Sequence, residues 1–540
     1  MKAAKLALSS MSLLVVLACG GDDAAAGDGS TSASTGTEAT TGASSGTDGD
    51  ASSSSGGDET TGGPTECTFI DTFDAAHCPK APPCRLYVDG SVATSGDGTS
   101  WATALRTVQE GIDLVHCGVL AGGCEQGQVW VKEGTYYVYE GCEWDAVRLR
   151  QGVAVYGGFA GDETELAARD FVAHETVLDG RDALDSPTTV YHVVHGADEA
   201  MLDGFTVQFG AANALDEGSD QFGGGLLNLA RAPTIANCTF RDNYATQHGG
   251  AIASVGGQPT ITGCVFEDNT AIGHGSGVYV IEGTPVISDS EFRLNASGML
   301  GDPAGGGAFT CDGCTDALVS RSHFEANAAF RGGGVYGLGS TLTISECTFV
   351  GNYAGRAGGG AQLQFGDYVV ERSAFSSNEA FVFGGALSVG GSDGSFELVN
   401  VLAAYNEAPT GSSLEGAESG PVTIRFSTIA HNLASEGTAI LGPPDLTIDS
   451  SIVWNPDGLG ELSSVGQTAL SVVYSDIRGG AEGTMNLDVD PMFVGRDAGD
   501  FGLVPGSPCI DAGNPVDAPA TDAAGNPRDA MPDIGALEAP

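Results

Sequence analysis

Cysteines are the residues of this chain whose number and spacing most directly suggest chemistry. The 540 residues include 13 Cys, and six of them fall between positions 67 and 142. Setting Cys19 aside leaves an even number, which is typical of disulfide-bonded proteins from oxidising compartments. The paired short knuckles of a zinc site are absent, so we expect disulfides, and sequence selects no pairing. The candidate disulfide cysteines are Cys67, Cys78, Cys84, Cys117, Cys124, Cys142, Cys238, Cys264, Cys311 and Cys314.

For two pairs of these cysteines the sequence offers an alternative to a simple structural disulfide. Cys311 and Cys314 have the spacing of a redox motif, but no βαβ pattern surrounds them, so a loop disulfide is expected. Cys238 and Cys264 stand 26 residues apart at equivalent positions of a repeat. A disulfide and a stacked pair of thiols explain that spacing equally well.

Histidines and aspartates are the candidate metal ligands. His248 and His274 are one repeat apart, but the pattern supplies no third ligand, so a solvent-facing stack is expected. Asp511, Asp522 and Asp533 are candidate Ca²⁺ ligands, although capping turns explain them equally well and the usual Ca²⁺-loop spacing is absent. No cofactor is evident, and Ca²⁺ is the single candidate.

The N-terminus predicts export and a lipid anchor. Lys2 and Lys5 precede an apolar run over 6–18, which has the length of a secretory h-region and is too short to span a bilayer. The sequence VLACG at its end resembles a bacterial lipobox. That resemblance implies cleavage before Cys19 and its acylation, so 1–19 is expected to be a lipoprotein signal peptide. The membrane is then a partner through the N-terminal lipid.

The charge of the chain excludes one class of partner. With 70 acidic residues against 21 basic ones, the formal charge is −49, so no nucleic-acid surface is expected. Residues 20–66 consist mainly of Gly, Ser, Thr and Ala, with acids and no basic residue. Such a segment cannot bury a core, and we expect a disordered acidic tether that lifts the folded body off the membrane.

A repeat of about 26 residues is the strongest pattern in the folded body. Its mark is a Phe followed three residues later by an Asn, at spacings of 26, 26, 32, 25 and 26. Gly-rich strand starts follow the Asn residues, and an aliphatic residue stands five positions before each Phe. The expected structural ladders are Phe240, Phe266, Phe292, Phe324, Phe349 and Phe375, and Asn243, Asn269, Asn295, Asn327, Asn352 and Asn378.

One period therefore holds three short strand-like pieces separated by turn residues. Stacking such units predicts an all-β fold, a right-handed parallel β-helix with three strands per coil and capped ends. Equivalent residues then form ladders at the strand spacing of ~4.8 Å, with Phe inside and Asn at a turn. We assign 67–149 to a disulfide-rich N-terminal cap and entry to the β-helix, 150–504 to the β-helix and 505–540 to a C-terminal capping module.

The outward-facing positions test whether equivalent residues of successive coils lie side by side. Like charges on neighbouring strands repel, so such positions should not carry the same charge. The residues after the Phe read Arg241, Glu267, Arg293 and Glu325 down the coils. The residues three before it read Asp289, Arg321, Glu346 and Arg372. Both series alternate in sign, which indicates that equivalent residues of successive coils are neighbours.

The two ends of a solenoid need protection. An open edge of unpaired strands favours aggregation, so solenoids carry atypical caps. We expect the Pro- and Asp-rich segment 505–540 to cover the C-terminal edge. The amphipathic stretch 104–115 is expected to cover the other end.

The motifs resemble known families. The segments 240–243 and 249–252, with their later copies, are similar to the polymorphic outer-membrane-protein repeat. The segment GDGTSWATA at 96–104, with YVD before it and VWVKEGTY and YGGF after it, resembles the opening of pectin-lyase-like β-helix proteins. Both resemblances imply the fold that the repeat predicts.

The C-terminal part has a resemblance of its own. The segments DPMF at 490–493, PGSPCIDAG at 505–513 and DIGALE at 533–538 look like the choice-of-anchor C-terminal module. That module is usually followed by a C-terminal anchor, whereas this sequence stops at Pro540. The resemblance therefore implies that Cys19 serves as the anchor.

The pectin-lyase-like resemblance also raises an enzyme as an alternative. Lyases of this fold need clustered carboxylates for Ca²⁺ and a basic residue nearby, whereas the outward acids here alternate with Arg. The Asn-Thr-Asp and Arg-Ile-Lys motifs of polygalacturonases are absent, and His248-Gly249 belongs to a structural Gly pair. We therefore expect no catalytic residue.

The expected function is that of a lipid-anchored cell-envelope protein with a structural or adhesive role. It would be an outer-membrane lipoprotein exposed at the cell surface, with a surface glycan or a protein as its partner. The alternative is a polysaccharide lyase or glycoside hydrolase of the pectin-lyase-like fold. Acids and a base converging on one outer face would favour the enzyme, and a broad surface would favour the adhesin.

Overall fold

The computed structural model describes residues 73–184, 188–215, 218–298, 305–464 and 470–540. These segments belong to one compact unit, Pro64–Pro540. Cys19, the expected tether 20–66 and Cys67 lie outside the described residues. No helix in the described segments combines the length and the hydrophobicity needed to cross a membrane.

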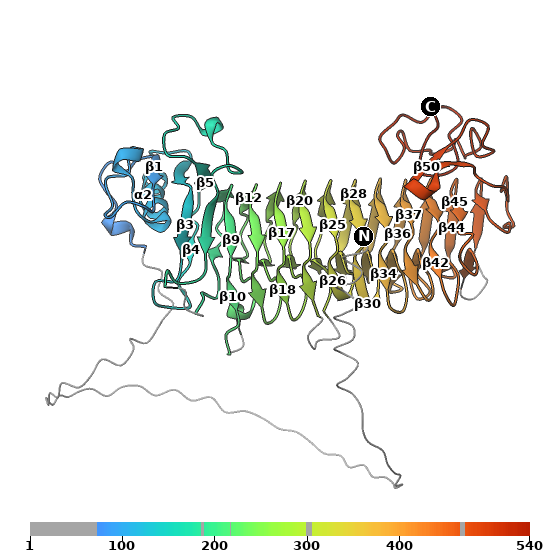
Figure 1. The fold of residues 1–540 in the computed structure, drawn as a ribbon, viewed down its shortest axis with the longest axis horizontal. Helices are drawn as coiled ribbons and strands as arrows, with labels where there is room; N and C mark the ends of the chain where they lie inside the picture. The colour runs from blue at the N-terminus through green and yellow to red at the C-terminus, as the bar shows by residue number, and fades with distance from the viewer. Residues whose placement is uncertain (1–72, 185–187, 216–217, 299–304, 465–469) are drawn as a thin grey trace, which may run out of the picture. The chain divides into compact units, whose positions relative to one another are not determined.

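The fold is all-β, and its strands stack in parallel from one coil to the next, as the repeat predicts (Figure 1). Over the described segments there are about thirteen coils of about 26 residues. A typical coil runs through β12 (Thr234–Ala236), β13 (Thr239–Arg241), β14 (Tyr244–Ala245) and β15 (Ile252–Val255). These four strands belong to four sheets, which we name A, B, D and C in that order.

The prediction of three strands per coil was therefore one strand short. Sheets A, B and C are the three predicted pieces, and sheet D directly follows the Asn of the repeat. Most strands of sheet D have two residues. Its strands are β10 (Ala211–Ala212), β14, β18 (Thr270–Ala271), β22 (Ala296–Ser297), β26 (Ala328–Arg331), β30 (Tyr353–Ala357), β34 (Glu379–Ala380), β38 (Glu407–Ala408) and β42 (Leu433–Ala434).

Sheet A extends furthest toward the N-terminus, and its inward residues are mainly aliphatic. Ile235, Ile261 and Ile287 are in register and buried. The strands are β1 (Arg85–Val88), β2 (Gly127–Lys132), β5 (Val153–Phe159), β8 (Met201–Asp203), β12, β16 (Thr260–Thr262), β20 (Val286–Ser288), β24 (Ala317–Ser320), β28 (Thr341–Ser345), β32 (Asp367–Glu371), β36 (Phe396–Val399), β40 (Val422–Arg425), β44 (Leu446–Asp449) and β47 (Ser471–Val473).

Sheet B carries the Phe residues of the repeat. Their rings are fully buried, with successive centroids 4.4–5.4 Å apart from Phe240 to Phe375, so they form a continuous stack. The strands are β3 (Gly134–Tyr137), β6 (Thr176–Asp179), β9 (Thr206–Gln208), β13, β17 (Val265–Glu267), β21 (Glu291–Arg293), β25 (His323–Glu325), β29 (Thr348–Val350), β33 (Ala374–Ser376), β37 (Leu402–Ala404), β41 (Thr428–Ala430), β45 (Ile452–Trp454) and β48 (Asp476–Ile477).

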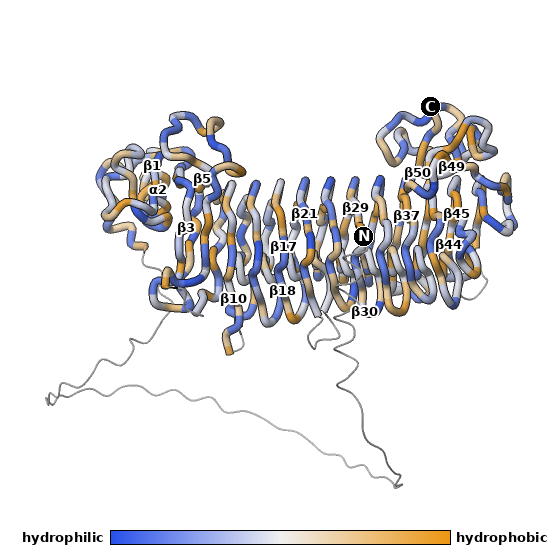
Figure 2. Tube along the Cα trace, viewed as in Figure 1, coloured by the Kyte–Doolittle hydropathy of each residue, from blue (hydrophilic) through white to orange (hydrophobic). Residues whose placement is uncertain are grey.

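Sheet C begins after a Gly-rich corner and completes each coil. The hydropathy pattern along the strands repeats from coil to coil, as expected when equivalent residues share one environment (Figure 2). The strands are β4 (Val147–Arg148), β7 (Val194–His195), β11 (Leu226–Leu229), β15, β19 (Val278–Ile281), β23 (Phe309–Asp312), β27 (Val335–Leu338), β31 (Ala361–Gln364), β35 (Leu387–Gly390), β39 (Leu414–Glu415), β43 (Ile440–Gly442) and β46 (Leu462–Ser464).

Small inward residues define the position of sheet D. Its second residue points inward and is Ala in nearly every coil, as at Ala354, Ala380 and Ala408, which pack on one another. A larger side chain would not fit between sheet D and the Gly-rich corner. Adding a Cβ to Gly359 would bring it 2.6 Å from the carbonyl oxygen of Glu379.

The Asn residues of the repeat form a hydrogen-bonded ladder at the corner between sheets B and D. From Asn243 to Asn455, each Nδ2 donates to the Oδ1 of the Asn in the next coil at 2.9–3.1 Å. The backbone N–H of each Asn donates to that same Oδ1. The ladder therefore has a direction, with its donors facing the C-terminal end.

Glu461 terminates this ladder. The N–H of Asn455 lies 2.9 Å from both carboxylate oxygens of Glu461, and its Nδ2 donates to Oε2 at 2.7 Å. A carboxylate only accepts hydrogen bonds, so it suits a position that receives only donors. Burial raises the pKa of Glu461, although the amide donors of Asn455 and the guanidinium of Arg478 act in the opposite direction.

Left-handed residues separate sheet A from sheet B. The residue three before each Phe position has φ between 44° and 62°, and most of these residues are not Gly. They are Asn237, Gly263, Asp289, Arg321, Glu346, Arg372, Asn400, Phe426 and Ser450. A non-Gly residue in this region costs about 1 kcal/mol or more, so the neighbouring strands must hold it there. We call this row the A/B corner.

The N-terminal end of the core is closed by helix α2 (Val108–Leu120). The helix begins after Thr107, whose side chain accepts from the Glu110 N–H, and Val108, Ile112 and Val115 are buried in the main core. The expected amphipathic stretch 104–115 overlaps this helix. Gly111 lies so near to strand β2 that a Cβ there would be 2.9 Å from Val129 Cγ1.

The solenoid strands end at β48, before the predicted limit at residue 504. Beyond it the chain turns back along the last coil. The N–H of Leu487 donates to Ser475, the N–H of Tyr474 donates to Thr484, and Asn486 Nδ2 donates to Val472, all to backbone oxygens at 2.8–2.9 Å. Residues 484–487 therefore cover the end of sheets A and B, part of the edge that we expected 505–540 to cover.

Residues 491–540, here named the C-terminal module, lie instead on the outer side of earlier coils. The module contains a short hairpin, β49 (Phe493–Gly495) and β50 (Asp500–Leu503), beside the ribbon of the last coils (Figure 1). The N–H of Gly535 donates to the Ser450 carbonyl and that of Ala536 to Thr428 Oγ1, at 2.8 and 2.9 Å. The expectation that 505–540 caps the end was therefore wrong in its position.

The outer face of sheet B changes character where this module begins. In the row that directly follows the Phe, outward residues are charged from Arg241 to Glu325 and then become small or apolar, as at Ala404 and Ala430. Ile452 packs with Leu503, Cys509 and Ile534, and Ala404 and Ala430 pack with Phe501. The module therefore buries apolar surface that the last coils would otherwise expose.

Candidate functional site

The candidate functional site is the part of the outer face of sheet B that the module leaves uncovered. We call it the open face and define it by the outward residues of β13 to β29. They are Thr239, Arg241, Val265, Glu267, Glu291, Arg293, His323, Glu325, Thr348 and Val350, all partly or fully exposed. On the N-terminal side of this stretch Arg169 lies 2.6 Å from Asp203 of β8, and on the C-terminal side the module contacts Asn400 of the A/B corner.

The expected charge series lies in register on this face. Arg241, Glu267, Arg293 and Glu325 occupy equivalent positions of four adjacent strands. Arg293 makes a bidentate pair with Glu267, with Nε–Oε1 and Nη2–Oε2 distances of 2.8 and 3.0 Å. Its Nη1 also lies 3.0 Å from Glu291 Oε1. One guanidinium therefore holds two carboxylates.

The second charge series lies at the A/B corner and not within a strand. Arg321 Nη2 is 2.7 Å from Asp289 Oδ2, and Arg372 Nη2 is 2.8 Å from Glu346 Oε1. All four residues have left-handed backbones. The alternation predicted the pairing between coils, but it did not distinguish an outward strand position from a corner.

The paired carboxylates of the open face and of the adjoining A/B corner are held in their ionised form. The Arg293 guanidinium lowers the pKa of Glu267, and the Arg321 guanidinium lowers that of Asp289. A glycosidase acid needs the opposite shift, because it must carry a proton near neutral pH. These groups are therefore suited to binding charged or hydroxyl groups, and not to donating protons.

His323 adds a hydrogen-bonding imidazole to the open face. Its Nε2 lies 3.5 Å from Glu325 Oε2, and its Nδ1 contacts Thr348 Oγ1. Sequence reasoning did not select this residue. The signal was its position one residue before Phe324, where the strand alternation places it outward.

The cysteines of the N-terminal region form disulfides around helix α2. Cys78 is bonded to Cys117, and Cys84 to Cys124. Cys142 is disulfide-bonded as well. Cys311 and Cys314 form the loop disulfide.

Cys238 and Cys264 are free thiols in the structure, which favours the stacked pair of thiols over the alternative of a disulfide. Each Sγ donates to a backbone oxygen two residues earlier, at 3.1 Å for Cys238 and 3.4 Å for Cys264. Equivalent residues of stacked coils have parallel Cα–Cβ bonds, so the two sulfurs do not converge as a disulfide requires.

His248 and His274 are stacked on the outer side of the corner before sheet C. Their ring centroids are 5.0 Å apart, and the His274 N–H donates to His248 Nδ1 at 2.8 Å. Tyr279 lies 4.5 Å from His248. Over the described part of the chain, no three His, Cys, Asp or Glu residues are grouped closely enough to hold a metal ion.

The candidate Ca²⁺ aspartates of the C-terminal module accept hydrogen bonds from amides. Asp522 Oδ1 accepts from the N–H groups of Ala524 and Asn526, and its Oδ2 from that of Glu538. Asp533 accepts from the N–H groups of Asp511 and Ala539. This geometry favours the turn-capping alternative, and Ca²⁺ stays a prediction.

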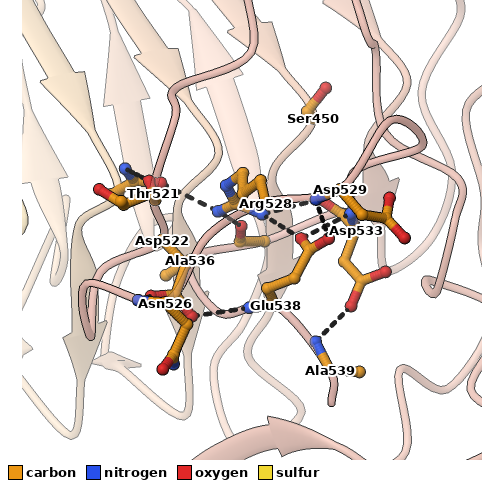
Figure 3. Close-up of polar contacts among 12 residues, drawn as sticks. Ser450, Thr521, Asp522, Asn526, Arg528, Asp529, Asp533, Ala536, Glu538 and Ala539 are labelled. Carbon is orange, nitrogen blue, oxygen red and sulfur yellow. Dashed lines mark hydrogen bonds and ion pairs between the residues drawn. The ribbon is translucent and has the colours of Figure 1, made fainter.

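Arg528 anchors the module to the solenoid. Its side chain is 1 % exposed, and its guanidinium lies 2.9 Å from Glu538 Oε2 within the module (Figure 3). Nη2 also donates to Asn400 Oδ1 at the A/B corner, and the guanidinium stands 4.7 Å above the Phe426 ring. Sequence reasoning missed this anchor because its partners are about one hundred residues away.

Comparison with known proteins agrees with this architecture. Residues 223–401 match a family model described as a right handed beta helix region. No curated protein shows a significant match to the chain. Together with the observed coils, the family model defines a right-handed parallel β-helix.

Three solved structures resemble the chain at low identity. Pectate lyase Pel9A has a TM-score of 0.41 and 13 % identity, over 85 % of this chain and 97 % of that one. A rhamnogalacturonan lyase has a TM-score of 0.34 and 12 % identity, over 76 % of this chain and 91 % of that one. The third structure is the tailspike protein gp49 of the Acinetobacter baumannii bacteriophage Fri1, a capsular polysaccharide depolymerase. It has a TM-score of 0.34 and 9 % identity, over 70 % of this chain and 62 % of that one.

Proposed function

We propose that this chain is a lipid-anchored cell-envelope protein that presents the open face to a surface glycan or a protein. The observation that carries the proposal is the open face itself. It is a continuous row of outward, mainly polar residues across adjacent coils, between the Arg169 contact and the C-terminal module. A row of this kind suits an extended partner.

The state of the carboxylates favours binding over hydrolysis. Glu267 and Asp289 are paired with arginines that stabilise their ionised forms. Ionised carboxylates and guanidinium groups can bind hydroxyl, amide and charged groups without further chemistry. The structural or adhesive role therefore needs fewer assumptions than a lyase or hydrolase.

The proposed cellular location rests on the N-terminal sequence and on the disulfides. The VLACG motif ends the apolar run, and the acidic tether follows it. Disulfides such as Cys78–Cys117 are typical of oxidising compartments. The lipid on Cys19 would hold the protein at the outer membrane, and protease treatment of whole cells would report whether it is exposed.

The binding proposal is tested on the soluble chain from residue 67 to 540. It is incubated with acidic and neutral polysaccharides, with and without Ca²⁺, and both binding and new chain ends are measured. We expect binding that is weakened by Arg293→Ala with Glu267→Ala, and no new chain ends. New chain ends would overturn the proposal in favour of the lyase or hydrolase.

The anchor is tested separately by labelling cells with radioactive palmitate. We expect label in the wild-type protein and none in the Cys19→Ser variant. Label that persists in the variant would contradict acylation at Cys19. This test is independent of the ligand test, so the two halves of the proposal fail separately.

A further inference from the structure

A second site lies where the solenoid meets the hairpin of the C-terminal module, away from the open face. A cavity of about 420 Å³ opens between them. His431 and Trp454 line it from the solenoid. The residues that line it from the module side are Asp490, Phe493, Arg496 and Asp497.

His431 lines this cavity and carries a hydrogen-bonding atom that has no partner among the described residues. Its side chain is 9 % exposed, and its Nδ1 lies 3.3 Å from Asp457 Oδ2. Its Nε2 is buried and has no hydrogen-bond partner among the described residues. When Nδ1–H donates to Asp457, the Nε2 of the neutral ring carries a lone pair. A buried acceptor without a donor is uncommon, which suggests that a ligand supplies the donor.

The position of His431 is fixed by its surroundings. Its backbone is left-handed, with φ 56°, at the corner between sheets B and D. The Tyr405 and Phe501 rings lie 6.0 and 6.2 Å from its ring. The Tyr405 and Phe501 rings are also 5.8 Å from each other, so the imidazole packs in one cluster with them before any ligand arrives, which lowers the entropy lost on binding.

The charged residues around the cavity determine which ligand charge is favoured. Asp490 and Asp497 line the cavity, and Asp457 stands behind His431. Arg496 is the basic residue in the lining, and its Nε lies 3.8 Å from Asp497. The site is therefore net negative, on a chain whose formal charge is −49. An anionic ligand is disfavoured by this field.

The aromatic residues add a preference for an organic cation. Trp454 lines the cavity from the outer face of β45, and Phe493 lines it from β49. The face of an indole ring attracts ammonium groups more strongly than other aromatic rings do. A protonated primary amine fits this set, since its N–H groups can meet His431 Nε2 and a carboxylate while its carbon chain packs on the rings.

We propose that this cavity binds an alkylammonium group, carried either by a small amine or by a lysine side chain of a partner protein. The site is distinct from the open face and does not depend on the function proposed for it. The C-terminal module then has a binding role besides covering the last coils.

The test is a titration of the folded chain with n-butylammonium and with n-butanol, its uncharged analogue, followed by calorimetry. We expect saturable binding of n-butylammonium and none of n-butanol. Comparable binding of the two would overturn the proposal. This comparison uses the wild-type protein, so it does not depend on whether a variant folds.

Two variants then locate the site. His431→Leu removes the acceptor and Trp454→Leu removes the aromatic face, and each is expected to weaken binding of n-butylammonium about tenfold. His77→Leu, at an exposed histidine outside both proposed sites, is the matched control and should bind like the wild type. Unchanged affinity in both site variants, with wild-type circular dichroism, would also overturn the proposal.

A second pair of probes distinguishes the two sources of the amine. Nα-acetyl-lysine amide is compared with Nα-acetyl-norleucine amide and with n-butylammonium. Tighter binding of the lysine amide supports a protein partner, and tighter binding of n-butylammonium supports a small amine. Equal binding of the lysine and norleucine amides would contradict recognition of the charge.

Discussion

Arg293 illustrates how single side chains connect the coils of this protein. Its guanidinium fork matches the two oxygens of Glu267 in the previous coil and also reaches Glu291 within its own strand. A lysine has the same charge but cannot make the bidentate pair. The residue therefore acts through its geometry as well as its charge.

We predict that Arg293→Lys lowers the free energy of unfolding by about 0.5–1 kcal/mol, because the fork is lost in a partly exposed site. Urea denaturation measures the change. Arg356→Lys, at an exposed arginine elsewhere on the solenoid, is the control and should have a smaller effect. Equal effects of the two variants would contradict a special role for the bidentate pair.

The same pair predicts a dependence on pH. Arg293 lowers the pKa of Glu267 from its ordinary value of 4.5, so the folded state binds a proton less readily than the unfolded state. The stabilisation is present above pH 4.5 and is lost as the pH falls through the folded pKa. The stability difference between the wild type and Glu267→Gln should therefore shrink in acid, which pH-dependent urea unfolding will show.

The interactions of individual side chains were only partly predictable from the sequence. The alternating signs predicted that Arg321 and Asp289 are neighbours, and they form an ion pair. Their left-handed backbone was not foreseen, because a corner residue stacks on its equivalent just as a strand residue does. His431 was missed for a related reason, since its cavity is completed by residues 59 or more positions later.

The Asn ladder is the element that most strictly fixes the register of the coils. Asn327 accepts from both the N–H and the Nδ2 of Asn295, and donates in turn to Asn352 and to the Phe292 carbonyl. Every member is buried. An interruption therefore leaves donors without partners and without water.

We predict that Asn327→Ala lowers the free energy of unfolding by about 2–4 kcal/mol, because two buried donors of Asn295 lose their acceptor. Urea denaturation of the variant provides the measurement. Ser376→Ala, an outward position of sheet B, serves as the control. A loss below that of the control would show that the ladder does not contribute to stability.

The end of the ladder gives a separate prediction. Glu461→Gln replaces one of the two acceptor oxygens by an NH₂ group, which faces the donors of Asn455. We expect faster hydrogen exchange at the amides of Asn432 and Asn455, while the amides near Asn269 are unchanged. Glu482→Gln, at an exposed site nearby, should leave all of these rates as they are.

Sheet D is an example of an element that the sequence repeat does not predict. Strands A, B and C each include an apolar inward residue that recurs once per coil, so their number and register were predictable. A strand of two residues, such as β14, is too short to show alternation. Its inward Ala looks in the sequence like any small residue in a turn.

At the scale of the whole molecule, the C-terminal module determines which outer surface stays accessible. Its position on the side of the solenoid was not predicted, because the relevant signal requires the register. Once the register is known, the change from Glu325 to Ala404 and Ala430 at outward positions marks where a cover begins. The sequence of an isolated strand does not show this.

We predict that Arg528→Met detaches the module. The substitution leaves Glu538 buried without its partner, which costs about 3–5 kcal/mol. Limited proteolysis should then remove the module while circular dichroism of the solenoid is retained. The double variant Arg528→Met with Glu538→Leu should recover part of the protection, and Arg496→Met, at an exposed arginine of the same module, should not release it.

The direction of the Asn ladder has a consequence for how such a chain can change over generations. Each Asn offers donors to the coil after it and an acceptor to the coil before it, so a duplicated coil meets the same partners on both sides. Unequal recombination between neighbouring copies can therefore add or delete whole turns while α2 and Glu461 stay at the two ends. An insertion that shifts an Asn out of the stack breaks the ladder, whereas the spacing of 32 residues between Asn295 and Asn327 leaves their hydrogen bonds intact.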